Sequence, residues 1–135
     1  MIRPLLTSVA IILCFAIAGD SERINMQVTI TAGTPVRLAG ISTPVNRLFI
    51  QSLHSNTGIV DVLLGVPVAT PCDATNAAQL TAELGPGDAT HPGQSFSDPQ
   101  GANGNSPSDY ENLITSCIDG SHTGDKVIVS FWRRN

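Results

Sequence analysis

Oxygen-bearing side chains gather in one polar stretch between residues 98 and 111. The stretch holds Asp98, Asn103, Asn105, Asp109 and Glu111. Carboxylate and amide oxygens are the ligands that Ca²⁺ takes from proteins, so these residues form a candidate calcium loop. Their spacing matches no EF-hand, and a solvated polar loop is the preferred interpretation. We therefore expect no resident metal ion or cofactor. If the protein does bind calcium, these five residues are the candidate ligands.

The residue types needed for catalysis are present without the patterns that catalysis needs. His54, His91 and His122 lie in turn or loop sequence with no second ligand at metal spacing. There is no Gly-x-Ser-x-Gly elbow and no cysteine beside an identifiable base. A carboxylate pair such as Asp109 and Glu111 is common in any sequence and does not by itself indicate a glycosidase. The sequence predicts a protein that is not an enzyme.

Two of the three cysteines are candidates for a disulfide. Cys14 lies in the N-terminal apolar run, which leaves Cys72 and Cys117 as the pair. In a secreted protein these two would form a bridge between the loop region and the penultimate strand. In a protein that folds in the cytosol they would be buried free thiols. The sequence leaves both states open.

Residues 1–25 also have two interpretations. A basic start, an apolar run and the Ala-Ile-Ala sequence at 16–18 match a secretory signal peptide, which would place the protein outside the cytosol with Gly19 first. Alternatively, residues 22–24 are compatible with a ribosome-binding sequence upstream of a start codon for Met26. Residues 1–25 would then be a mis-annotated extension, and the folded domain would span 26–135.

Composition limits the partners. The formal net charge is -4, with 7 basic and 11 acidic residues, which argues against nucleic acid or an anionic membrane surface as the main partner. Charged residues make up 13% and aromatic residues 4% of the chain, while turn-forming residues are plentiful. This composition is typical of short strands joined by turns.

The apolar pattern predicts an all-β fold. Alternating or continuous apolar runs separated by turn signals indicate about six to eight short antiparallel strands, arranged as a β-sandwich or a jelly-roll-like barrel. Predicted strands lie at 26–31, 36–38, 46–53, 59–64, 113–118 and 126–132, and a further short strand is placed within 79–84. Residues 85–112 are rich in Gly and Pro and are predicted to form one long loop.

The closing strand has two apolar faces. Val127, Val129 and Phe131 point one way, and Ile128 and Trp132 point the other. One sheet packed beneath it covers only one of these faces. We therefore predict that Ile128 and Trp132 form a subunit contact.

Three aromatic residues of the predicted strands are candidates for a sugar-binding surface. Trp132, Phe131 and Phe49 are candidates for a platform on which a sugar stacks. Because all three lie in strongly apolar strands, core packing is the preferred interpretation.

Several segments, taken in order, resemble a known family. They are Thr-Ala-Gly-Thr-Pro-Val-Arg-Leu at 31–38, Leu-Phe-Ile-Gln at 48–51, Asn-Thr-Gly at 56–58, Leu-Gly-Pro-Gly-Asp at 84–88, and the segment 118–132. This order resembles small all-β structural proteins of tailed bacteriophages, of the capsid decoration, cement or head-fibre type. The resemblance implies a non-enzymatic virion protein that contacts the major capsid protein or other virion proteins and forms a homo-oligomer such as a trimer. The alternative is a secreted bacterial β-sandwich that binds a glycan or another surface ligand.

Overall fold

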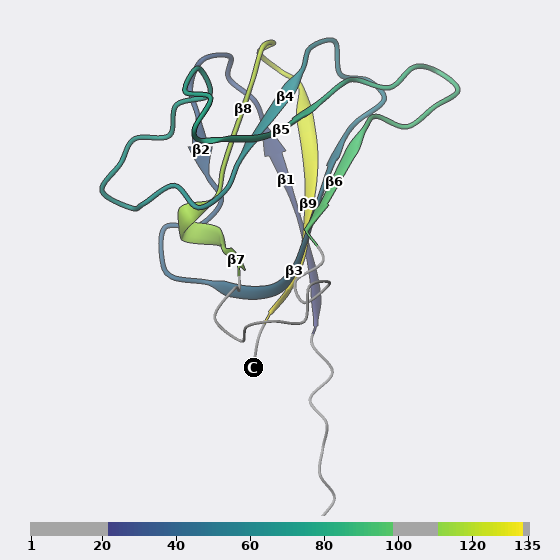
Figure 1. The fold of residues 1–135 in the computed structure, drawn as a ribbon. Helices are drawn as coiled ribbons and strands as arrows, with labels where there is room; N and C mark the ends of the chain where they lie inside the picture. The colour runs from purple at the N-terminus through teal and green to yellow at the C-terminus, as the bar shows by residue number, and fades with distance from the viewer. Residues whose placement is uncertain (1–21, 99–110, 134–135) are drawn as a thin grey trace, which may run out of the picture.

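Two antiparallel sheets packed face to face form the protein (Figure 1). The computed structural model describes residues 22–98 and 111–133. The strands are β1 (Arg23–Thr29), β2 (Val36–Arg37), β3 (Pro44–Ser52), β4 (Val60–Leu63), β5 (Leu80–Leu84), β6 (Ser95–Asp98), β7 (Glu111–Asn112), β8 (Cys117–Gly120) and β9 (Lys126–Arg133). A single 3₁₀ turn, η1 (Leu113–Thr115), precedes β8. The all-β prediction is confirmed, with the sandwich as its form.

The larger sheet is organised around the C-terminal strand. Its order is β1-β9-β3-β6, and β7 also pairs with β3. β9 is paired along its length with β1 on one side and β3 on the other. Val127 and Val129 are fully buried and Phe131 is 5% exposed, because these alternate residues of β9 face the second sheet. This inward set is the one that the sequence pattern predicted.

The smaller sheet covers that apolar face. Its order is β2-β8-β4-β5, again with antiparallel neighbours. Val60 and Val62 of β4 and Ile118 of β8 are fully buried against the larger sheet. A second, smaller cluster lies on the other side of this sheet, where Leu63 and Cys117 pack with Val66.

The prediction of one unbroken loop over residues 85–112 is wrong. β6 and β7 both lie within it, and both pair with β3. Phe96 packs against the core, and β6 satisfies backbone groups that the edge of β3 would otherwise expose. Gly93 lets the chain pass close to β3 before β6 begins, because a Cβ there would lie 2.2 Å from the carbonyl oxygen of Ser52. Residues 99–110 lie outside the described part of the chain.

The first strand begins earlier than the pattern indicated. We predicted a strand at 26–31, whereas β1 starts at Arg23 and ends at Thr29. Two of the three residues 23–25 are polar, so this segment lacks the apolar pattern that would predict a strand. They are held by pairing with residues 130–132 of β9. In the ranges 22–98 and 111–133 no helix is long and apolar enough to cross a membrane.

Candidate functional site

The side of the larger sheet that faces away from the core carries a mixed set of polar, cationic and aromatic side chains. We call it the outer face. It comprises Arg23, Asn25, Gln27 and Thr29 of β1, Lys126, Ile128, Ser130 and Trp132 of β9, Arg47, Phe49 and Gln51 of β3, and Ser95 and Ser97 of β6. Three of these side chains are cationic and none is a carboxylate, although the whole chain is acidic. The outer face is therefore an electropositive surface on a negatively charged protein.

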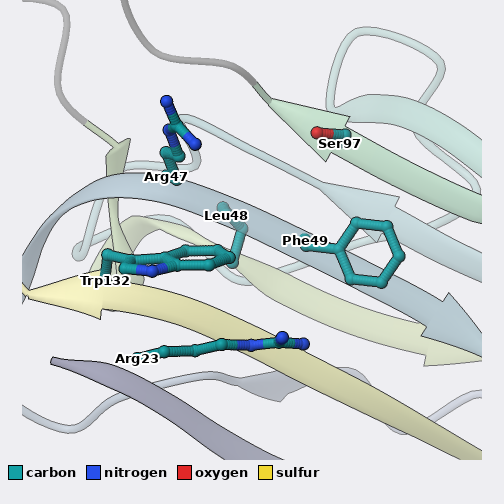
Figure 2. Close-up of a pocket in the computed structure, with 6 residues that line it drawn as sticks. All are labelled: Arg23, Arg47, Leu48, Phe49, Ser97 and Trp132. Carbon is teal, nitrogen blue, oxygen red and sulfur yellow. The ribbon is translucent and has the colours of Figure 1, made fainter.

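A pocket of about 280 Å³ opens on this face. It is lined by Arg23, Arg47, Leu48, Phe49, Ser97 and Trp132 (Figure 2). Leu48 belongs to the core and has no exposed surface, so β3 at this residue is the floor of the pocket. Its neighbours along the strand, Arg47 and Phe49, project to the outer side and form two of the walls.

Sheet register brings the lining residues together. Trp132 of β9 lies directly opposite Arg23 on β1 and opposite Arg47 on β3, so the three make one row across the sheet. Phe49 and Ser97 are likewise directly opposite each other on β3 and β6. Directly opposed side chains on one face have Cβ atoms about 5 Å apart. Four strands that are distant in sequence thus converge on one small site.

Arg23 is fixed in place without a carboxylate partner. Its guanidinium carbon lies 5.3 Å from the centre of the Trp132 ring, and Nη2 donates to Ser130 Oγ at 3.2 Å. Ser130 Oγ in turn donates to Asn25 Oδ1 at 2.6 Å. Ser130 is completely buried because these side chains close over it. The network holds a positive charge beside the indole.

Arg47 is the other cation of the pocket. Its side chain is exposed, and it makes no hydrogen bond or ion pair with the residues that the structure describes. Figure 2 shows Arg23 running alongside the indole while Arg47 stands on the other side of it. The pocket therefore combines one fixed and one free guanidinium with two aromatic rings.

The predicted aromatic platform is divided between the two sides of the sheet. Phe131 is in the core, as the preferred interpretation stated, whereas Trp132 and Phe49 are partly exposed on the outer face. The strand alternation separates Phe131 from Trp132, and the pairing of Phe49 with Ser130 places Phe49 on the side of Trp132. For Trp132 and Phe49 the expectation of core packing is wrong.

The predicted subunit-contact residues share this face. Ile128 is half-buried and lies four residues before Trp132 on β9, with the same orientation. Their shared face agrees with the alternation in the sequence. Their use as a subunit contact stays a prediction.

The candidate calcium loop is only partly described. Asp98 ends β6 opposite Leu48, and Glu111 begins β7 opposite Val45, so both lie along one side of β3. The three other candidates, Asn103, Asn105 and Asp109, lie outside the described residues. Over ranges 22–98 and 111–133, no group of three or more His, Cys, Asp or Glu side chains has the geometry to hold a metal ion. Calcium binding by this loop stays untested.

A disulfide joins Cys72 to Cys117, with Cα atoms 6.3 Å apart. It ties the loop that follows β4 to the fully buried start of β8. Arg37 reinforces the same loop. Its guanidinium donates to the carbonyl oxygens of Val66, Pro67 and Thr70, and also to that of Ile114. Sequence alone left the redox state open because it depends on whether the fold brings the two residues together.

A row of carboxylates crosses the outward side of the smaller sheet. Asp61 lies directly opposite Glu83 on β5 and Asp119 on β8. Burial raises the pKa of the Asp61 carboxyl, and the negative charges of Glu83 and Asp119 raise it further. Like charges directly opposite each other are destabilising in a sheet. Repulsion within this row therefore destabilises the fold. Within ranges 22–98 and 111–133, these carboxylates do not have the geometry to hold a metal ion.

The three histidines stay in loops, as expected. His54 and His122 are exposed, and His91 contacts only the turn around it, with Nδ1 3.0 Å from Asp88 Oδ1. Hydrogen bonds from Thr90, with a further one from His91, lower the pKa of Asp88 to about 2. The carboxylate accepts these bonds and closes an exposed turn. These contacts link Asp88, Thr90 and His91 within one exposed turn.

Comparison with known proteins adds no family. No protein-family model matches this chain, and no curated protein matches it. Function is therefore inferred from the geometry of the outer face and from the segments that carry the resemblance.

Proposed function

We propose that the protein is a non-enzymatic structural protein of a tailed-bacteriophage virion that decorates or cements the capsid or belongs to a head fibre. This proposal is supported by the resemblance and by the positions of the resembling segments in the fold. They supply β2, most of the second half of β3, the turn before β4, the end of β5, and β8 with β9. The resembling residues are thus the frame of both sheets.

Such a protein acts by surface contact. Its partners are the major capsid protein or other virion proteins, and it acts as a homo-oligomer, with a trimer as the expected state. Apolar side chains left outside the core are the natural contacts. Ile41 is 75% exposed and Val68 is 59% exposed, beyond what the fold itself requires. The observation that carries the proposal is the outer face, a broad surface that no described segment of the chain covers.

A second candidate is a secreted bacterial β-sandwich that binds a glycan or surface ligand. One specific observation favours it. Disulfides persist in oxidising compartments, and Cys72 is bonded to Cys117. The pocket at Trp132 would be its binding site. The two candidates share the fold and differ in where the chain is found.

Fractionation and N-terminal sequencing of native material separate the candidates. The virion proposal expects the chain to co-sediment with phage particles through a density gradient and to remain bound after a salt wash. The secreted candidate expects a soluble protein in the periplasm or medium, starting at Gly19 and with oxidised cysteines. Recovery as a soluble periplasmic monomer would contradict the virion proposal. The identity of the neighbouring genes, above all a major capsid or portal gene, is an independent check.

A further inference from the structure

We propose that the pocket on the outer face binds an acidic sugar residue, with the sugar ring against Trp132 and Phe49 and its carboxylate on Arg47. This proposal concerns the pocket itself and holds for a secreted protein, or for a virion protein whose contacts leave the pocket open. It adds a ligand class and a site to a protein otherwise expected to act by contact alone.

Size and shape indicate a single ring. The pocket volume of about 280 Å³ lies just below the range of about 300–1,000 Å³ that is usual for drug-sized ligands, which suits a single small ring. Its floor is the backbone of β3, and its walls are side chains of four strands, β1, β9, β3 and β6. Partly exposed aromatic rings offer apolar surface that water does not satisfy. The C–H face of a pyranose is an apolar surface of matching size.

The positive charge of the pocket indicates an acidic ligand. Both guanidiniums face the pocket without a carboxylate on the outer face to neutralise them. Arg23 is already committed to Ser130 and to the indole, so its charge contributes mainly to the field. Arg47 has its full set of donors free, and a guanidinium forms paired hydrogen bonds with a carboxylate. A neutral sugar would leave this donor set unused.

Hydroxyl groups are the remaining feature of a sugar, and the pocket has a partner for them. The Ser97 hydroxyl is exposed at the rim, opposite Phe49, and makes no hydrogen bond with the described residues. A serine hydroxyl both donates and accepts, which suits a sugar hydroxyl. The pocket therefore offers stacking, a salt bridge and a neutral polar contact within one ring's reach.

The backbone pairing argues against an acidic peptide as the ligand. Peptides that bind sheets usually add as a strand along a free edge, where main-chain groups are unpaired. The floor of this pocket is β3, which is paired with β9 on one side and with β6 on the other. A peptide lying on this face would find no main-chain partner, whereas a compact ring needs none.

Intrinsic fluorescence gives a direct test, since Trp132 is the single tryptophan of the chain. The probes are D-glucuronate and tri-galacturonate, titrated into the full chain, with D-glucose and N-acetylglutamate amide as comparisons. We expect the uronates to give a saturable change in emission. We expect the affinity for glucose to be at least tenfold lower, because glucose has no carboxylate to pair with the Arg47 guanidinium.

Two charge-matched variants assign the signal to the pocket. Arg47→Gln should lower uronate affinity at least tenfold, with unchanged thermal unfolding because the Arg47 side chain makes no hydrogen bond or ion pair within the described part of the chain. Lys126→Gln removes the same charge from the same face about 20 Å along β9 and should bind normally. The absence of saturable uronate binding, equal binding by Arg47→Gln, or binding of N-acetylglutamate amide as tight as that of glucuronate would each overturn the proposal. The last result would indicate a general carboxylate site that also accepts acidic peptides.

Discussion

Arg23 lies over the indole of Trp132, with its guanidinium carbon 5.3 Å from the ring centre, so that the first residue of β1 is anchored near the end of β9. The two residues are also direct cross-strand partners. Arg23 donates to Ser130 as well, and Ser130 donates to Asn25. Residues that precede Met26 are therefore bound into the larger sheet by both backbone and side-chain contacts.

A chain that starts at Met26 should be less stable than one that starts at Glu22. It loses the contact of Arg23 with the ring, worth about 0.5–1 kcal/mol, and two side-chain hydrogen bonds, each worth about 0.5–1.5 kcal/mol. We expect the free energy of unfolding to fall by about 1.5–4 kcal/mol, measured by urea denaturation. Arg23→Gln in the longer chain should reproduce part of this loss. Equal stability of the two chains would show that the pairing of residues 23–25 contributes nothing.

Reduction of the disulfide should destabilise the fold. Cys72 and Cys117 are 45 residues apart, and a bridge closing a loop of this length stabilises a protein by about 2–4 kcal/mol. We expect the urea midpoint to fall on addition of dithiothreitol and the transition to become steeper, because the unfolded chain without the bridge exposes more surface.

The cysteine variants separate the bridge from packing. Cys72→Ala should show nearly the same loss as reduction, because Cys72 is partly exposed. Cys117→Ser should lose more, since it also places a hydroxyl at a fully buried position. A protein whose unfolding is insensitive to reductant would contradict the contribution of the bridge.

Patterns local in sequence predicted most of the fold. The alternation of Val127, Val129 and Phe131 identified the buried face of β9, because period-2 burial follows from the strand itself. β6 was missed for the opposite reason. Its sequence, Ser-Phe-Ser-Asp, has one apolar residue and is flanked by Gly and Pro, and it becomes a strand because β3 offers it an edge.

The pocket was beyond local patterns. Arg23, Arg47 and Trp132 meet only through the order β1-β9-β3, which a sequence does not display. The pairing of Phe49 with Ser130 decides which face Phe49 takes, and a one-residue shift of register would have put it in the core. The alternation of Phe131 and Trp132 was the one available signal. It supported the predicted subunit contact at Trp132, but it was not applied to the aromatic platform, for which core packing was preferred.

Replacement of Ile128 tests the predicted subunit contact. If the outer face joins subunits, Ile128→Asn should shift the protein from oligomer to monomer, because an amide would have to be desolvated at the contact. We expect the monomer to stay folded, since Ile128 is half-buried and faces away from the core. Sedimentation equilibrium measures the oligomeric state of each variant. Gln27→Asn, the cross-strand neighbour of Ile128 on β1, is the matched control and should leave assembly unchanged.

Assembly and sugar binding through this face exclude each other near Trp132, because a subunit seated over the indole would close the pocket. Trp132→Ala should abolish assembly if the contact includes the ring. An oligomer that persists in both the Ile128→Asn and the Trp132→Ala variants would place the subunit contact elsewhere.

Asp61 should make the protein less stable as the pH rises. Burial and the charges of Glu83 and Asp119 raise the pKa of this carboxyl above its ordinary value of 3.8 in the folded state. The unfolded chain therefore loses its proton first, and stability falls as the pH rises from 3.8 through the folded pKa. Above that pKa the penalty is complete.

Asp61→Asn should consequently stabilise the protein at pH 7 by about 0.5 kcal/mol, the scale of a like-charge cross-strand pair. At pH 3, where the carboxyl is protonated in both states, the gain should largely disappear. Urea denaturation of both proteins at the two pH values measures the difference. Asp73→Asn is the control of opposite sign, because hydrogen bonds from Thr75 lower the pKa of Asp73 and make its charged form favourable in the fold. An Asp61→Asn protein that is less stable at pH 7 than the parent would show that the carboxylate row is compensated by a contact of its own.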